Sequence, residues 1–480
     1  DRVERGTGFV HQEHLGRRGH GPRDAKPLLL PARQPRAGLG QPVLHLAPGN
    51  GLSTDLCDDN SVLAPGITFR TEVVLIHADF GVLAQRMGLG QFFVDIAAVI
   101  AGRYTGGLAK VSVVSSAFFG TISGSSIANT VSTGAFTIPM MKKAGFKPHV
   151  AGGIEPAASI GGMFMPPIMG AGGFIMAELT GVPYSQIMLI AIFPALMYFF
   201  SVFMMVHFEA KKHNIVGEKS DRNALDILKA EWFYITPLVV ITIFMLLGYS
   251  PGYSAILGLI ACLAVSWFRK ETRIGPTRFI EAARQGALSS LQIGATLGVI
   301  GIIIGVLTYS GLVLTFADIV IEAADGKLWL TILFVALASL VLGMGVPVTA
   351  AYLITAVVAV PALTHLGVNL IAAHMIVYWL SQDSNITPPV CIAAFAGATI
   401  AKANMWKTAF TAFKFAKFLY LAPFLFGYVP AFSLDGSPAD IGVAFALIII
   451  GTWLYSWLLS GIWISFFRKS EAAASTESNH

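Results

Sequence analysis

Long stretches without Asp, Glu, Lys or Arg dominate the chain from residue 111 onward. They are residues 111–141, 179–208, 232–268, 285–317, 328–382, 384–401, 418–434 and 441–467. One membrane-crossing helix needs about 20 apolar residues, so 186–206, 287–309 and 441–467 each predict a single crossing. Residues 232–268, interrupted by Tyr249-Ser250-Pro251-Gly252, predict two crossings with a tight turn. The pattern predicts an all-α polytopic membrane protein with roughly eight crossings and two hairpins.

Composition supports this class. The 480 residues are 55% hydrophobic and 12% charged, whereas soluble domains carry about 25% charged residues. The three cysteines (Cys57, Cys262, Cys391) form no C-x-x-C pair, which argues against a disulfide scaffold and a transition-metal site. The net charge of +5 sits in short basic clusters between apolar runs, so we expect lipid around the protein and no nucleic-acid partner.

The basic residues are distributed unequally between the two predicted sides. Beyond residue 70 there are 23 Lys and Arg, and 21 of them fall on one side, in residues 103–147, 211–229, 269–284, 402–417 and 468–469. Lys327 falls opposite, and Arg86 is unplaced. Because cytoplasmic loops are enriched in Lys and Arg, this side and the C-terminus are predicted to be cytoplasmic.

The first seventy residues differ from the rest. They hold 16 of the 59 charged residues and seven of the 24 prolines, with no long apolar run. They predict either a disordered, weakly basic tail or a mistranslated segment from a wrong start or frame. Residues 90–102 are a short segment with Phe92, Phe93, Ile96, Val99 and Ile100 on one helical face, and they predict an interfacial helix.

Two stretches predict re-entrant hairpins. Residues 111–141 are too long for one crossing and too short for two, and both flanks are basic. A hairpin with the polar stretch 120–130 at its tip fits, provided that this tip is buried or lines a cavity. Residues 328–363 repeat the logic from the other side, around 343–349.

Each hairpin is followed by a helix with a double proline, Pro166-Pro167 within 149–177 and Pro388-Pro389 within 370–401. Proline removes a backbone donor, so both helices must be broken there, and the freed carbonyl groups can bind an ion. An offset of 222 residues relates the two halves and maps Ala128 to Ala350, Thr133 to Thr355, Pro139 to Pro361, Gly145 to Gly367, Ala151 to Ala373, Pro166 to Pro388, Pro167 to Pro389 and Ala171 to Ala393. We therefore expect an inverted-repeat secondary transporter with its sites near the midplane.

The tips and breaks offer the oxygen ligands that a sodium ion prefers. Candidate sodium ligands are Ser123, Gly124, Ser125, Ser126, Asn129, Gly345, Val346, Thr349, Asp383, Asn385 and Thr387. The helices that begin after tips and breaks point positive dipole ends inward, which favours an anionic substrate. Candidate substrate contacts are Ser125, Glu155, Pro166, Pro167, Pro347 and Pro388. Close helix packing by Ser and Gly is the structural alternative for the tips, and a capping role is the alternative for Glu155.

Enzyme motifs are missing: the sequence has no G-x-x-x-x-G-K-[ST], H-E-x-x-H or G-x-S-x-G. We expect a non-enzyme without a cofactor other than sodium as the coupling ion. Two alternatives stay open, a sodium- or proton-coupled anion carrier that needs no binding protein and an intramembrane serine hydrolase. A channel is harder to exclude from the sequence.

The motifs together resemble a known family. They are Phe119-Gly-Thr-Ile-Ser-Gly-Ser-Ser-Ile-Ala-Asn129, Met165-Pro-Pro-Ile-Met-Gly170, Leu342-Gly-Met-Gly-Val-Pro347 and Ser381-Gln-Asp-Ser-Asn-Ile-Thr-Pro-Pro389. Over roughly residues 75–467 the chain resembles the large permease subunit of TRAP (tripartite ATP-independent periplasmic) transporters. It is most similar to the fused small-plus-large permeases that work with TAXI-type binding proteins.

The resemblance implies a sodium-driven, elevator-type importer of small organic anions, mostly carboxylates, in the bacterial or archaeal inner membrane. An extracytoplasmic binding protein delivers the substrate, and a small permease subunit or fused domain is a second partner. By motif position, residues 123–126 and Asn129 would form one sodium site, and Gly345, Thr349, Asn385 and Thr387 the other. Pro166 and Pro388 would mark the substrate-facing breaks.

The expected organisation divides the chain into seven parts. They are an unmatched segment (1–70), a remnant scaffold helix with the interfacial helix (71–110), the first transport repeat (111–206), scaffold helices with cytoplasmic loops (207–327), the second repeat (328–432), a C-terminal crossing (433–467) and a cytoplasmic tail (468–480). Compared with the family, the fused small subunit and first scaffold helices are expected to be missing from the front.

Overall fold

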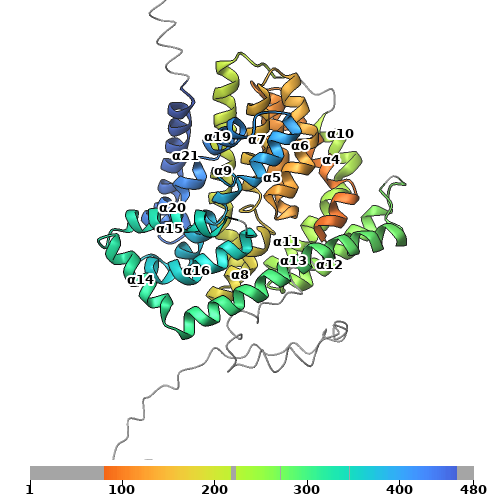
Figure 1. The fold of residues 1–480 in the computed structure, drawn as a ribbon. Helices are drawn as coiled ribbons and strands as arrows, with labels where there is room; N and C mark the ends of the chain where they lie inside the picture. The colour runs from red at the N-terminus through yellow and green to blue at the C-terminus, as the bar shows by residue number, and fades with distance from the viewer. Residues whose placement is uncertain (1–79, 218–222, 271, 345, 462–480) are drawn as a thin grey trace, which may run out of the picture. The chain divides into compact units, whose positions relative to one another are not determined.

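The computed structural model describes residues 80–461, apart from residues 218–222, 271 and 345 (Figure 1). The chain divides into two units, residues 1–54 and 55–480, and all described residues belong to the second. The predictions for residues 1–70 and for the tail 468–480 lie outside this range. Every regular element in the described range is helical, as predicted for an all-α protein.

The first predicted hairpin is a helix–turn–helix pair. Helix α5 (Gly107–Ser123) and helix α6 (Ser126–Lys143) pack against one another. A broken helix follows, consisting of α7 (Pro148–Gly161), an irregular segment with Pro166-Pro167, and α8 (Gly170–Thr180). The long helix α9 (Tyr184–Lys212) completes this part of the chain.

The second half repeats these elements. Its hairpin is formed by α15 (Leu328–Leu342) and α16 (Val348–His365), and its broken helix by α17 (Leu370–Leu380), the 3₁₀ turn η3 (Asp383–Asn385) and α18 (Ile392–Ala401). The helix starts 126 and 348, 148 and 370, and 170 and 392 each differ by 222 residues. The spacing seen in the sequence is therefore also the spacing of the helices.

Backbone geometry follows the same spacing. Met169 and Cys391, each at the start of the second half of a broken helix, both have positive φ angles (53° and 36°). Gly145 and Gly367, after the hairpins, also have positive φ angles (102° and 86°). The Pro166-Pro167 and Pro388-Pro389 peptide bonds are both cis.

The remaining helices lie between and after the two halves. They are α10 (Ala224–Glu231), η2 (Trp232–Ile235), α11 (Thr236–Leu246), α12 (Pro251–Ser266), α13 (Pro276–Tyr309), α14 (Leu312–Ala323), α19 (Met405–Phe415), α20 (Phe418–Tyr428), η4 (Pro430–Ser433) and α21 (Pro438–Ser460). Helices α11 and α12 pack together across the predicted turn at Tyr249–Gly252. Helix α21 packs against α9.

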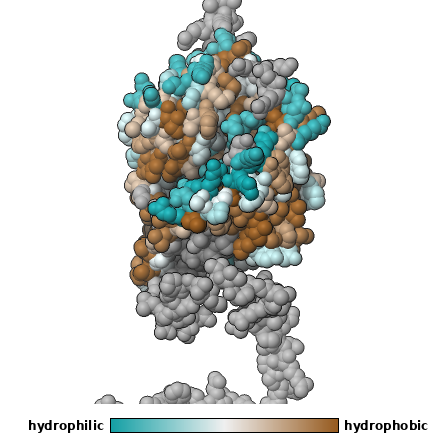
Figure 2. Space-filling model, turned by 90° about the vertical axis from the view of Figure 1, so that its right-hand side faces the viewer, coloured by the Kyte–Doolittle hydropathy of each residue, from teal (hydrophilic) through white to brown (hydrophobic). Residues whose placement is uncertain are grey.

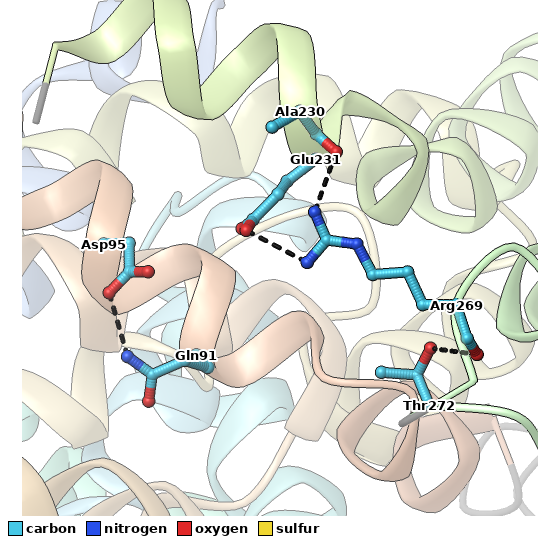
Figure 3. A network of polar contacts seen from close by, with 6 residues as sticks. All are labelled: Gln91, Asp95, Ala230, Glu231, Arg269 and Thr272. Atoms are coloured by element: carbon cyan, nitrogen blue, oxygen red, sulfur yellow. Dashed lines mark hydrogen bonds and ion pairs between the residues drawn. The ribbon is translucent and has the colours of Figure 1, made fainter.

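A polar network joins the segment after α12 to the end of α10 (Figure 3). The Arg269 guanidinium pairs with the Glu231 carboxylate at 3.3 Å and donates to the Ala230 carbonyl at 3.1 Å. Thr272 donates to the carbonyl group of Arg269 at 3.4 Å, and on α4 (Leu89–Ala101) Gln91 donates to Asp95 at 2.9 Å. Arg269 thereby ties together two segments that the sequence analysis assigned to the basic side.

Within the described residues, five helices are long and apolar enough to cross a membrane, or six if the bent pair Phe80–Arg86 and Leu89–Ala101 is one span. The prediction of roughly eight crossings is higher, because shorter helices such as α12 were counted as crossings. Large apolar side chains are exposed on α21, for example Leu447 (64%) and Ile450 (62%). Figure 2 shows broad brown apolar patches on one face of the protein. Such patches are typical of surfaces that lie against lipid or another subunit.

Two sequence-based predictions need correction, the interfacial position of residues 90–102 and the start of the first hairpin. Helix α4 (Leu89–Ala101) packs on α5 and buries Phe92 and Phe93, so its apolar face contacts protein; only Ile100 is well exposed (49%). Helix α5 starts at Gly107, earlier than the charge-free run. Lys110 is buried inside it, with its ammonium group 3.2 Å from His207 Nδ1 and 4.6 Å from the centre of the Phe203 ring. These contacts allow a charge within the helix.

Candidate transport site

The tip of the first hairpin is a two-residue turn. Gly124 has a φ angle of 53°, in the left-handed region that favours glycine, and ends α5. Ser125 is the N-cap of α6 and accepts a hydrogen bond from the Ala128 N–H at 3.3 Å. The predicted ligands Gly124 and Ser125 therefore have clear structural roles in the turn itself.

Glycines allow this hairpin to lie directly on the first break. A methyl group at Gly120 would lie 2.2 Å from the Gly162 Cα atom, and one at Gly124 would lie 2.7 Å from the Gly170 Cα atom. Both distances are shorter than any tolerable carbon contact, so no side chain fits between these backbones. The hairpin and the broken helix of the first repeat form one closely packed body.

The other predicted ligands at this tip have different surroundings. Ser123 Oγ is buried without a hydrogen-bond partner. Ser126 is buried, and its carbonyl accepts from Thr130 at 2.8 Å. The Asn129 amide donates to the carbonyls of Ser116 at 3.1 Å and Ser159 at 3.4 Å. Asn129 therefore holds hairpin 1 against α7, while Ser123 is the oxygen at this tip that lacks a partner.

Tyrosine hydroxyl groups satisfy the carbonyl groups of the first break. Tyr184 donates to the carbonyls of Pro167 at 2.6 Å and Ile168 at 2.8 Å. Tyr378 donates to Met163 at 2.7 Å and contacts the Met169 carbonyl. Each hydroxyl has one hydrogen, which it can donate to either of its two neighbouring carbonyl oxygens, one at a time. In this structure, tyrosine hydroxyl groups occupy the carbonyl oxygens that were predicted to be available to an ion. Pro166 is half-buried and Pro167 buried in the same segment.

The two breaks also meet through aromatic rings. Phe164 in the first break stacks on Trp379, near the end of α17, with ring centres 3.9 Å apart and planes 9° apart. The Tyr378 ring fills the space beside Gly172, where a methyl group would lie 2.3 Å from Tyr378 Cε2. Phe164, Trp379 and Tyr378 were not among the residues predicted from the sequence. The signal was present, because a tyrosine hydroxyl within an apolar helix needs a hydrogen-bond partner.

The second tip lies on its own break, as the first does. A methyl group at Gly343 would lie 2.9 Å from the side chain of Ser384. Val346, Pro347 and Thr349 are half-buried around the start of α16. Gly345, the remaining predicted ligand of this tip, lies outside the described residues.

Buried polar groups without partners gather at the second break. Asp383 is 3% exposed and its Oδ1 atom has no hydrogen-bond partner, and both amide atoms of Gln382 also lack one. Asn385 is buried and donates to the Gln382 carbonyl at 3.4 Å. Thr387 is hydrogen-bonded to the Tyr420 hydroxyl at 2.5 Å. Pro388 is half-buried beside them.

Unpartnered buried oxygens are costly, so Asp383, Gln382 and Ser123 mark the positions where a ligand would be stabilised. Gln382 is an addition to the predicted set. Within the described residues, no three His, Cys, Asp or Glu side chains lie together in a way that would hold a metal ion.

Glu155 is not at either break. It lies on α7 with 0% exposure, surrounded by hydroxyl groups from α5, α6 and its own helix. Its carboxyl oxygens contact these hydroxyl groups and cap no helix end among the described elements, so the capping alternative is not seen; the substrate contact stays a prediction.

Comparison with known proteins identifies the family. The family model for the DctM component of tripartite ATP-independent periplasmic transporters matches residues 59–432. The chain belongs to this family. It is therefore a TRAP large permease, a multi-pass inner-membrane transporter subunit and not an enzyme, which excludes the serine-hydrolase alternative.

Three similar proteins illustrate the relationship. A putative TRAP transporter large permease protein of Haemophilus influenzae is 24% identical over 65% of this chain and 73% of its own length. The sialic acid TRAP transporter permease protein SiaT of Haemophilus influenzae is 24% identical over 67% of this chain, which spans about half (52%) of that longer protein. The crystal structure of the Alcanivorax borkumensis YdaH transporter has a TM-score of 0.55 at 18% identity, covering 79% of this chain and 91% of that one, a likeness of fold alone.

The Tyr378 hydroxyl gives a testable link between the two halves of the permease. We expect Tyr378→Phe to lower the free energy of unfolding by about 1–2 kcal/mol, because two buried carbonyls lose their donor. Unfolding of the detergent-solubilised protein measures this loss. Tyr428→Phe, which removes a hydroxyl from a 54% exposed ring, is the matched control and should have almost no effect. Equal losses in both variants would contradict the role of Tyr378.

Proposed function

We propose that this permease is the membrane subunit of a sodium-coupled TRAP importer of a small organic anion. The observation that carries the proposal is the group of buried, unpartnered polar atoms at a hairpin tip and the second break, Ser123 Oγ, Asp383 Oδ1 and the Gln382 amide. A sodium ion bound by these oxygens would supply the missing electrostatic partner.

The proposed sodium ligands follow the two repeats. In the first, Ser123 and nearby oxygens of Gly124, Ser125 and Ser126 would surround one ion, with Asn129 holding the tip in place. In the second, Asp383, Asn385 and Thr387 would bind an ion together with oxygens of Gly345, Val346 and Thr349. The matching helix starts of the two halves support a site in each.

An anionic substrate would lie near the breaks. Helices α8 and α18 both begin immediately after a break, and helix N-termini attract negative charge. Pro166, Pro167 and Pro388 lie in the breaks before these helix starts. Pro347 is the N-cap residue of α16 at the second tip, and Ser125 is the N-cap residue of α6 at the first. The related SiaT permease is named for sialic acid, an acid by name. A small carboxylate is the substrate class that fits these features.

The proposed assembly includes an extracytoplasmic binding protein and a small permease subunit or fused domain. We place the C-terminus in the cytoplasm because the basic clusters share its side. The closely packed hairpins and broken helices would move as an elevator-type transport domain against the remaining helices. The similarity to fused TAXI-type permeases is part of the same proposal.

Reconstitution tests the coupling. The permease is placed in liposomes with its binding protein, and uptake of a panel of radiolabelled small carboxylates is measured with and without an inward sodium gradient. We expect uptake only with the gradient. Equal uptake under both conditions would refute sodium coupling, and gradient-driven uptake without the binding protein would favour the binding-protein-independent carrier.

A further inference from the structure

The carboxyl group of Glu155 is enclosed by five hydroxyl groups. Ser116 donates to Oε1 at 2.8 Å and Ser159 approaches the same atom at 3.4 Å. Ser112, Thr133 and Thr137 make the closest contacts, to Oε2, Oε1 and Oε2 respectively. Four of these five side chains belong to hairpin 1, which therefore forms most of the enclosure.

The number of hydrogens in this cluster is limited. A hydroxyl group carries one hydrogen and can donate it to one acceptor at a time. Thr133 Oγ1 lies 2.7 Å from the Asn129 carbonyl, and Thr137 Oγ1 lies 3.1 Å from the Thr133 carbonyl. When these hydroxyls donate to the backbone, their oxygens meet the Glu155 oxygens without a hydrogen between them. A hydrogen on the Glu155 carboxyl group would supply one of these two contacts.

No positive charge compensates a Glu155 carboxylate in the described part of the chain. On the packed helices, Lys110 contacts His207, Lys142 donates to the Ala401 carbonyl at 2.8 Å, and Lys414 lies 3.9 Å from Glu209. Tyr198 donates to the Ala157 carbonyl at 2.6 Å.

The other charged or titratable groups on these helices are at their ends, and none has a described contact with Glu155. They are Lys143 on α6, His149 at the start of α7, Lys211 and Lys212 on α9, and Lys407 on α19. Helix α18, which packs on α7, contributes no charged residue. An uncompensated buried carboxylate costs several kcal/mol. Binding a proton removes that cost.

We propose that Glu155 and its hydroxyl groups form a proton-binding site that hairpin 1 closes. The proton comes from water and forms an O–H bond on a carboxylate oxygen, and its return to water requires hairpin 1 to separate locally from α7. The site is thus a further cation site in the permease, distinct from the two proposed sodium sites at the tips and breaks. Its use in the transport cycle rests on the proposed function, whereas proton binding itself does not.

Infrared spectroscopy of the full chain in phospholipid nanodiscs tests the site without substrate or sodium. A protonated carboxyl group gives a carbonyl stretching band that shifts in deuterated water. We expect this band at neutral pH in the wild type, its loss in Glu155→Gln, and its retention in the matched control Glu178→Gln, whose carboxyl group is exposed on α8. A band that is missing in the wild type or kept in Glu155→Gln would overturn the proposal.

A second variant removes the dependence on Glu155→Gln folding correctly. Thr137→Val keeps the side-chain shape and deletes one hydroxyl at the carboxyl group, so the band should change frequency without disappearing. An unchanged band in this variant would assign it to another carboxyl group and refute the site.

Replacement of choline chloride by sodium chloride at constant pH distinguishes the two cations. Loss of the band on sodium addition would mean that Glu155 and its hydroxyl groups bind sodium, which would contradict the proposal. Failure of the infrared test leaves sodium-coupled uptake untouched, and failure of sodium-coupled uptake leaves the carboxyl band untouched.

Discussion

Gly162→Ala is expected to destabilise the permease by about 3 kcal/mol or more, at the upper end of the cost of overpacking. The new methyl group would lie 2.5 Å from the Gly120 Cα atom, 3.2 Å from the Ser159 carbonyl oxygen and 3.3 Å from the Asn129 amide nitrogen. The nearest obstacle is backbone, which cannot rotate away as a flexible side chain can. Hairpin 1 must therefore shift from the first break, and the Asn129 hydrogen bonds must lengthen.

Thermal and denaturant unfolding in detergent measures this effect. Gly451→Ala on α21 is the matched control, because a methyl group there meets no atom within 4 Å and alanine favours a helix. We expect this control to be neutral or slightly stabilising. A Gly162→Ala protein as stable as the wild type would mean that the hairpin and the break are not in contact.

The hairpins and breaks could be predicted from the sequence because each has a local cause. A charge-free run too short for two crossings predicted two helices with a polar turn within residues 120–130, and the structure has this turn at Gly124 between α5 and α6. The double prolines predicted the interruptions between α7 and α8 and between α17 and α18. Backbone rules that act within a few residues decide all of these features.

The partners across the fold could not be predicted in this way. Tyr184 satisfies the first break from the start of the next helix, α9, and Tyr378 satisfies it from the other half of the chain. Glu155 was placed near a substrate because a carboxylate in an apolar segment is usually functional. Its hydroxyl partners on α5 and α6 become visible only when the hairpin is folded onto α7. Such contacts depend on tertiary packing, which the local patterns of a single sequence do not reveal.

Asp383 is the carboxylate for which the sequence argument and the structure agree best. It is buried beside the second break, and its Oδ1 atom lacks a partner, in contrast to the enclosed Glu155. A bound sodium ion would compensate its charge and stabilise the folded state, since a ligand that binds only the folded protein raises its stability in proportion to RT ln(1 + [L]/Kd). Sodium should therefore raise the melting temperature of the wild-type permease more than choline does.

Asp383→Asn is expected to raise the sodium concentration for half-maximal thermal stabilisation at least about 10-fold, equivalent to about 1.4 kcal/mol of binding free energy. The amide keeps the shape and one acceptor oxygen but removes the negative charge that attracts the cation. Asp226→Asn, at an exposed position on α10, is the matched control and should leave the sodium titration unchanged. Melting curves over a sodium series at constant ionic strength, balanced with choline, measure both variants. An unaltered midpoint in Asp383→Asn would remove Asp383 from the sodium ligands and with it the main electrostatic argument for an ion at the second break.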